Sequence, residues 1–358
     1  MTCPLTRRCF LGTAMVSGWE GAQTPAVSGE GSPRTAGTLD IHLHLFGKGD
    51  AGSGCRLSKE VAEGTLFHLL AASLRISQRA KTLDEGYVLA LAEHLATSGL
   101  TKGLILAQDA VYDSSGRPDW GKTQFYVPND YLFQVVDRYP RWMIPCVSIN
   151  PKRAGAVAEL ERCAAKGARV LKIHPPTQGM DLSETRYRGF FRRSAELKIV
   201  VMVHTGHEHS APIVSAELAS PRKLALALEE GCTVVACHCG TGWPTDRPDM
   251  LPDFLAMVRK YKNLFGDTSV LGSAGRVRDM SRLLADGEAK DRLLHGSDFP
   301  FPAAPLAFAK TFGIPRAARL QAIDNPIRKD FALKDALGIG RASAERAYRL
   351  ICGEENRS

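Results

Sequence analysis

The histidines His42 and His44 lie two residues apart in a short apolar stretch, residues 39–47. Leucine and isoleucine at every second position from 39 to 45 predict a β-strand. Side chains alternate between the two faces of a strand, so both imidazoles are expected on one face and the aliphatic side chains on the other. Two imidazoles at one strand end can reach the same metal ion, which makes metal-assisted chemistry the first hypothesis.

Polar side chains recur in order at the ends of later predicted strands. They are His174, His204, His238 and Asp298. Alternation places each of them on one strand face with the residues two and four positions earlier. For His238 this predicts an inward face shared with Val234 and Ala236. Because several strands end in this way, we expect the polar residues to meet at one edge of a sheet.

The elements that must position these residues are eight β-rich segments, each followed by a loop and usually by a helix. The segments are residues 39–47, 102–107, 142–148, 168–174, 199–204, 233–238, 264–268 and 293–298. Repeated βα units predict an α/β fold with a parallel sheet, and this number of units predicts a (β/α)8 TIM barrel. Residues 48–100, helical from about 58 to 97, form a predicted insertion after strand 1. An open doubly wound sheet is the alternative, but no G-x-G-x-x-G fingerprint follows an early strand.

Five short motifs give the chain its resemblance to a known family. They are Asp40-Ile41-His42-Leu43-His44, Leu171-Lys172-Ile173-His174-Pro175, Val203-His204-Thr205-Gly206, Cys237-His238-Cys239-Gly240 and His295-Gly296-Ser297-Asp298-Phe299-Pro300. Together they resemble the metal-dependent amidohydrolase superfamily, in the amidohydrolase-related branch that includes aminocarboxymuconate semialdehyde decarboxylase and the dicarboxylate lactonases. The resemblance implies one divalent metal ion held by His42, His44, His204 and Asp298, with His238 as a nearby catalytic group.

The chemistry of these residue types agrees with the implied roles. A zinc ion held by nitrogen and oxygen ligands keeps a position open for water and lowers the pKa of that water. Asp298 can take the proton of the water, and His238 can polarise a carbonyl or protonate a leaving group. We therefore predict a hydrolase for a C–O or C–N bond of a small, carboxylated substrate. The alternatives are a non-oxidative decarboxylase on the same site and a barrel that binds metal without catalysis.

Other residues near the motifs have two interpretations each. Lys172 is predicted to be an ammonium that binds a substrate carboxylate; a lysine in this place is carbamylated in binuclear relatives, and a core lysine reaching solvent is the alternative. His174 is predicted to face the substrate or to support the ligands. His207, on the loop after strand 5, is a candidate for the substrate pocket or an ordinary surface residue. Cys237 and Cys239 flank His238 and are predicted to point away from it into the core.

The N-terminal segment resembles an export signal. The run from Thr6 to Gly12 contains Arg7 and Arg8 and precedes a short apolar stretch, as in twin-arginine signals. We predict a signal peptide over residues 1–28, a flexible linker over 29–38 and the barrel domain over 39–358. This predicts a periplasmic or other extracytoplasmic protein that the twin-arginine translocase exports. A cytoplasmic location is the alternative, favoured by cysteines without regular spacing.

The charge pattern bears on partners. The 358 residues carry a formal net charge of +8, but basic residues form no long run and do not alternate with aromatic ones. Nucleic-acid binding is therefore not expected. No apolar run is long enough to span a bilayer. The expected partner is a small-molecule substrate, and a homodimer is an assembly that the sequence allows.

Overall fold

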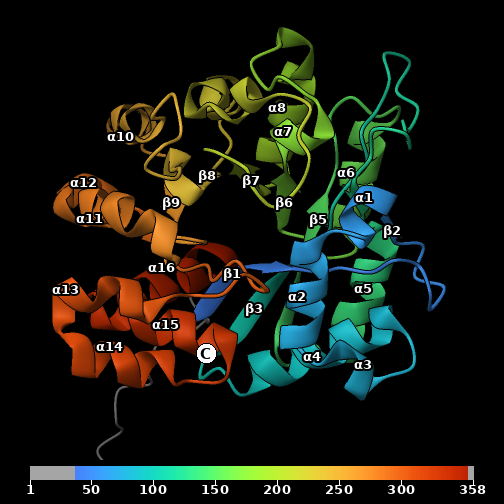
Figure 1. Cartoon of the computed structure of the whole chain (residues 1–358). Helices are drawn as coiled ribbons and strands as arrows, with labels where there is room; N and C mark the ends of the chain where they lie inside the picture. Colours follow the sequence, from blue (N-terminus) through green and yellow to red (C-terminus); the bar gives the residue numbers. More distant parts are fainter. Residues whose placement is uncertain (1–36, 354–358) are drawn as a thin grey trace, which may run out of the picture. The chain divides into compact units, whose positions relative to one another are not determined.

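Parallel β-strands form a ring inside a layer of helices (Figure 1). The structure is a computed structural model and describes residues 37–353. The ring consists, in order, of β1 (Leu39–His44), β3 (Lys102–Leu106), β5 (Met143–Ser148), β6 (Val170–Ile173), β7 (Val200–His204), β8 (Val234–Cys237), β9 (Leu264–Asp267) and β10 (Leu293–Leu294). The predicted signal peptide, and all of the predicted linker except residues 37 and 38, lie outside the described residues.

Backbone hydrogen bonds join the last part of the ring to the first. The Ile41 amide donates to the His295 carbonyl over 2.9 Å, and the His44 amide donates to the Phe299 carbonyl over 2.9 Å. The sheet therefore closes, with each strand parallel to its neighbours in sequence order. The eight predicted β-segments and the (β/α)8 barrel are confirmed.

Helices follow the strands on the outside of the ring. After β1 come α1 (Lys59–Ala62), α2 (Thr65–Ser73), α3 (Ile76–Arg79) and α4 (Leu83–Ala96). Along the middle of the chain lie α5 (Asn129–Arg138), α6 (Ala156–Ala165), α7 (Pro175–Gln178), α8 (Arg188–Glu196) and α9 (Ala225–Glu229). The rest are α10 (Leu251–Lys260), α11 (Val277–Ala285), α12 (Gly287–Lys290), α13 (Ala309–Phe312), α14 (Ile314–Gln321), α15 (Pro326–Ala336) and α16 (Gly340–Cys352). Two short strands, β2 (Arg56–Leu57) and β4 (Phe125–Tyr126), pair antiparallel outside the barrel.

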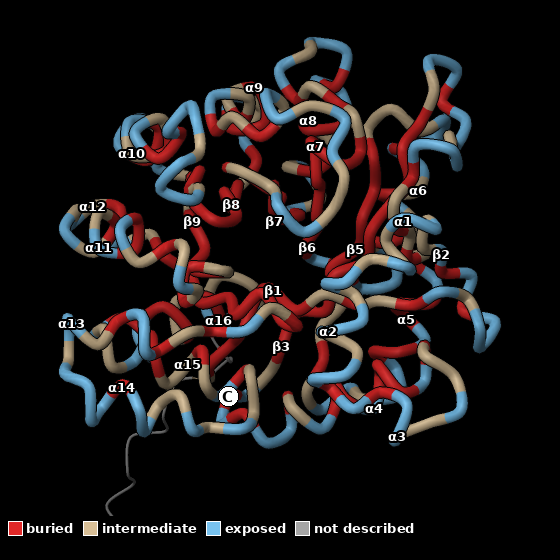
Figure 2. Tube along the Cα trace, viewed as in Figure 1, coloured by how far each residue is buried: buried red, intermediate tan, exposed pale blue. Residues whose placement is uncertain are grey.

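The strands are buried on both faces (Figure 2). One apolar cluster fills the barrel interior, and it includes Leu104, Val170, Met202 and Leu294 from different strands. A larger cluster lies between the strands and the surrounding helices. Tyr348 of α16 joins the interior cluster and lies against Gly37, just before β1. Helix α16 therefore covers the amino-terminal end of the barrel, and the opposite end carries the polar residues.

Two strands depart from the predicted alternation of side chains. In β8, Val235 and Cys237 face the interior, whereas Val234 and Ala236 face the helices, so the predicted parity was wrong. In β1, Leu39 and Ile41 face the interior but Leu43 faces the helices. The register of β1 against β3 shifts between Asp40 and Leu43, which reverses the facing of the chain part way along the strand.

Candidate metal centre and active site

A cavity of about 540 Å³ opens at the carboxyl ends of the strands. Its polar lining contains His42, His44, Lys172, His174, His204, Glu208, His238 and Asp298. The structure thus brings together every predicted site residue except His207. That residue lines a separate cleft, where its Nε2 atom lies 2.9 Å from the Pro248 carbonyl oxygen. His207 therefore does not line the cavity that holds the other predicted site residues, because the loop after β7 turns its side chain towards the separate cleft.

Three of the predicted metal ligands converge. The Asp298 Oδ1 atom lies 3.2 Å from His42 Nε2 and 3.3 Å from His44 Nε2. The Asp298 amide donates to the His42 carbonyl over 3.0 Å, which holds the loop after β10 against β1. Asp298 has a φ of 67°, a conformation that points its side chain back towards the histidines. Two imidazole nitrogens and one carboxylate oxygen make a donor set that suits a divalent transition metal.

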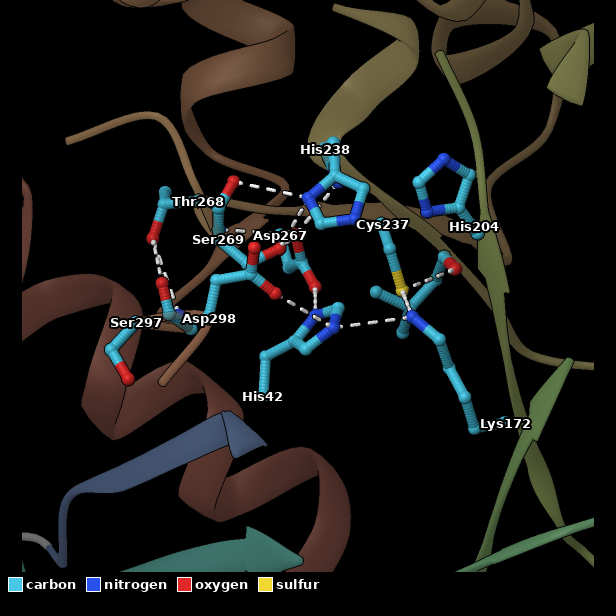
Figure 3. Close-up of polar contacts among 12 residues, drawn as sticks. His42, Lys172, His204, Cys237, His238, Asp267, Thr268, Ser269, Ser297 and Asp298 are labelled. Carbon is cyan, nitrogen blue, oxygen red and sulfur yellow. Dashed lines mark hydrogen bonds and ion pairs between the residues drawn. The ribbon is translucent and has the colours of Figure 1, made fainter. Parts of the chain in front are cut away.

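Asp267, at the end of β9, organises these residues and was not predicted. One of its carboxylate oxygens accepts from His42 Nδ1 over 2.7 Å. The other accepts from the His238 amide over 2.8 Å, the Ser269 amide over 3.1 Å and the Ser269 hydroxyl (Figure 3). A carboxylate that accepts from Nδ1 fixes the proton on that nitrogen, so the lone pair of His42 Nε2 faces the cavity. The position of Asp267 at the end of a predicted strand was the sequence feature that could have identified it as a site residue.

The protonation states suit metal binding at neutral pH. Burial, followed by the Lys172 ammonium, lowers the pKa of His42 to about 3, so this imidazole is neutral. Burial opposes the charge on Asp298, but the imidazoles of His42, His44 and His238 outweigh it and hold the pKa of that carboxyl below its usual range. Neutral imidazoles and an ionised carboxylate are the forms in which these side chains bind metals.

Lys172, on β6, lies inside the barrel directly beside His42. Its Nζ atom is 3.3 Å from His42 Nε2 and 3.0 Å from Cys237 Sγ. Burial disfavours the charge on Lys172, but Cys237, Asp267 and Asp298 outweigh it and raise the pKa of this amine. Cys237 is thus a buried core residue, as predicted, but it faces the interior of the barrel and not the surrounding helices. Cys239 does pack between the barrel and the helices, as predicted.

His204 lies in a second polar group that lines the same cavity beside the first. His174, His204 and Glu208 place donor atoms within 4.8 Å of one another, as do His42, His44 and Asp298. The rings of His174 and His204 stack with centroids 4.0 Å apart, and His174 Nε2 lies 3.1 Å from Glu208. Burial opposes the charge on Glu208, but His174 lowers its pKa to about 2. Glu208 lies on a loop without a motif, so the sequence did not indicate it.

His238 faces the same cavity between the two groups. Its ring centroid is 5.1 Å from that of His42 and 4.7 Å from that of His204. The Ser269 hydroxyl donates to Asp267, so it accepts a hydrogen bond from His238 Nδ1, 2.8 Å away. Burial lowers the pKa of His238, so the ring is neutral and its Nε2 atom carries the free lone pair. The backbone at His238 has a φ of 62°, and this turn brings the ring to the cavity.

Replacing Asp267 by Asn is expected to weaken metal binding. The amide keeps the volume and one acceptor oxygen, but it loses the negative charge that fixes the His42 tautomer. We expect Asp267→Asn to lower zinc affinity by about 10- to 100-fold, measured by competition with a chromogenic chelator. Asp253→Asn, on the outside of α10, is the control. Equal affinities of the two variants would show that Asp267 does not support the ligands.

The closed parallel barrel and the donor groups at its carboxyl end define a metal-binding (β/α)8 barrel protein. The sequence pattern of the Amidohydrolase family matches residues 40–340, so the chain belongs to this family. The predicted resemblance is confirmed. Among curated proteins, none matches the sequence.

Similar solved structures share the fold. An uncharacterized TIM-barrel protein from Bordetella bronchiseptica is 16% identical, with a TM-score of 0.57 over 88% of this chain and 99% of that chain. A probable 2-pyrone-4,6-dicarboxylic acid hydrolase from Acinetobacter baumannii is 15% identical, with a TM-score of 0.54 over 88% and 99%. A 2,6-dihydroxybenzoate decarboxylase from Rhizobium is 15% identical, with a TM-score of 0.50 over 88% and 99%.

Within residues 37–353, no helix is long and apolar enough to cross a membrane.

Proposed function

We propose that this protein is a metal-dependent hydrolase that cleaves a C–O or C–N bond of a small lactone, ester or amide. The observation that carries the proposal is the buried Asp298 Oδ1 atom. It faces His42 Nε2 and His44 Nε2 and makes no hydrogen bond to any described residue. A buried carboxylate oxygen without a hydrogen bond is costly unless a cation lies beside it. The residues present therefore fit the divalent ion that the family implies.

We propose His42, His44 and Asp298 as the ligands, with His204 as the fourth. The Nε2 atom of His204 is buried and has no hydrogen-bond partner among the described residues. Nitrogen and oxygen donors of this kind favour zinc, and manganese or iron are the alternatives that metal analysis would distinguish. A bound divalent ion supplies a water of lowered pKa and polarises the carbonyl of the substrate.

The side chains around the ligands supply the proton transfers. Asp298, ionised at neutral pH, can accept the proton of the attacking water. His238 carries its free lone pair at Nε2, so it can receive a proton at that atom and pass it to the leaving oxygen or nitrogen. The Lys172 ammonium can bind a carboxylate or the developing oxyanion of the substrate. His174 and Glu208 keep each other in place beside this group.

Non-oxidative decarboxylation of a small carboxylic acid is the second candidate. The position of the Lys172 ammonium, 3.3 Å from a proposed metal ligand, would place a substrate carboxylate directly at the reaction centre. The decarboxylase among the similar structures shows that this fold accommodates the reaction in another protein. Formation of carbon dioxide without consumption of water would identify a decarboxylase.

Metal removal tests the proposed function. We expect the purified protein to contain about one divalent ion per chain, with zinc proposed, and to act on a member of a panel of lactones, esters, amides and aromatic acids. A chelator should abolish this turnover and added metal ion should restore it. Turnover that persists in the metal-free protein would contradict the proposal. Bound metal without turnover on any member would favour a non-catalytic metal-binding barrel.

We also propose that the twin-arginine translocase exports the protein to the periplasm, where it forms a homodimer. The support is the Arg7–Arg8 pair in the N-terminal segment, outside the described residues. Changing both residues to lysine keeps the charge but removes the signal. We expect Arg7→Lys with Arg8→Lys to move the protein from the periplasmic to the cytoplasmic fraction of fractionated cells. An unchanged distribution would contradict export through the twin-arginine signal.

A further inference from the structure

The first helices after β1 leave apolar side chains unburied. None of the residues of α2 is buried, although leucine, phenylalanine and alanine make up most of it (Figure 2). Leu66 is 41% exposed and Leu69 is 63% exposed. The preceding helix α1 also has no buried residue. Apolar side chains left unburied together on one helix often mark a place where a ligand or a partner binds.

The inner side of these helices lines the same cavity as the candidate metal centre. Val61, Leu66, Phe67 and Leu70 form this wall together with Leu74, which follows α2. Phe46, Phe125 and Phe301 also line the cavity. The apolar wall is thus continuous with the polar end at His42 and Asp298. A volume of about 540 Å³ lies within the range of cavities that hold small organic ligands.

The charges of the cavity limit the acidic groups that a substrate can carry. Of the described residues that line it, Lys172 is the one lysine, and no arginine is among them. The exposed Glu60 lines the side formed by α1. Lys172 lies at the polar end beside His42. A second carboxylate on the far part of a substrate would therefore lie against the apolar wall, without a lysine or arginine of the described lining beside it, at a high desolvation cost.

We propose, on the basis of the proposed function, that the substrate is a monocarboxylic acid or its ester, lactone or amide with one bulky apolar group. The reacting carbonyl or carboxyl group lies at the metal centre beside Lys172. An aromatic ring or a medium-length alkyl chain lies against α2, where it covers Leu66, Phe67 and Leu70. The sequence-based prediction of a small carboxylated substrate thus becomes a monoacid, or a neutral derivative of one, with a large hydrophobic part.

Binding of simple carboxylates tests this proposal without requiring turnover. The full chain supplemented with Zn²⁺ is titrated calorimetrically with acetate, butanoate, hexanoate and octanoate, and with the diacid adipate. We expect affinity to rise roughly three- to fourfold for each methylene group that enters the apolar wall. This amounts to a gain on the order of 100-fold between acetate and hexanoate. Adipate, of the same carbon count as hexanoate, should bind at least about tenfold more weakly than hexanoate because its second carboxylate loses water without a partner.

Variants of residues on α2 test whether the apolar wall causes the rise in affinity along the alkanoate series. Leu70→Asn and, separately, Leu66→Asn should lower the affinity for hexanoate about tenfold and leave acetate unchanged, because a polar group then replaces the apolar contact. Leu69→Asn is the control, since Leu69 is on α2 but does not line the cavity. Circular dichroism checks that each variant is folded.

Each outcome decides for or against the proposal. Equal affinity along the alkanoate series, or tighter binding of adipate, would overturn it. Loss of dimerisation in Leu69→Asn, together with equal affinity along the alkanoate series in the wild-type protein, would assign the apolar surface to a second copy of the chain and also overturn it. A rising series in a protein without turnover on the substrate panel would support the apolar site while rejecting the proposed catalytic function.

Discussion

Asp298→Asn should lower kcat by about 10³-fold or more, because the amide can neither accept a proton from water nor carry the charge that holds a cation beside two imidazoles. The substitution conserves volume, so the turn after β10 and its hydrogen bond to the His42 carbonyl should persist. The loss should appear in kcat and in kcat/KM together, as for a group that acts in the transition state. Steady-state kinetics at saturating zinc, with the substrate found in the panel, measure it.

The control for this prediction is Asp130→Asn on the exposed face of α5, which should leave kcat unchanged. His238→Ala serves as the companion variant and should lower kcat by roughly 10²- to 10⁴-fold, the range for a lost acid–base group. Metal-dependent turnover that survives in both Asp298→Asn and His238→Ala would refute the roles assigned to these residues. Bound metal is quantified in each variant, so that loss of chemistry is distinguished from loss of the ion.

Lys172→Met should increase the affinity for the divalent ion by about tenfold or more. The Lys172 ammonium lies 3.3 Å from His42 Nε2 and repels any cation bound there. Even at an effective dielectric constant of about 20, unit charges 4 Å apart interact by roughly 4 kcal/mol, so a tenfold change is a conservative expectation. Methionine fills a similar volume inside the barrel without the charge. Chelator competition gives the affinity, and the same variant should raise KM for carboxylated substrates.

The direction of this change separates two states of the lysine. A carbamylated Lys172 would be a metal ligand, as in binuclear relatives, and its replacement would then weaken metal binding and lower the number of ions per chain. An ammonium predicts the opposite change. Lys262→Met, at an exposed position away from the cavity, is the control and should alter neither quantity.

The order of strands and the identity of most polar site residues were available from the sequence. Alternating apolar residues in eight segments, with helices between them, leave few folds other than a closed parallel barrel. The carboxyl ends of parallel strands meet at one end of such a barrel, so His42, His44, His238 and Asp298 could be assigned to one site before any coordinates. The Val200–His204 strand also showed the predicted alternation, with Met202 inside the barrel.

Alternation failed where the backbone departs from a regular strand. All four residues of β8 are apolar and buried, so either facing agreed with the sequence, and the true one puts Cys237 beside Lys172. His238 reaches the cavity through a left-handed backbone turn, and β1 changes its facing through a register shift. The hydrophobic pattern does not predict such local irregularities. It indicates that a side chain is buried, but not whether it faces the barrel interior or the surrounding helices.

Contacts between distant segments were decided by the tertiary structure alone. Asp267 and His42 are 225 positions apart in the sequence. They form a hydrogen bond because closure of the barrel brings the end of β9 close to β1. Glu208 joins His174 and His204 only because the loop after β7 folds back over the cavity, and that same loop turns His207 outwards. The sequence by itself determined which side chains could do the chemistry and at which end of the fold. The packing of strands and loops determined which of them touch, since contact distances depend on the whole chain closing on itself and not on any local pattern.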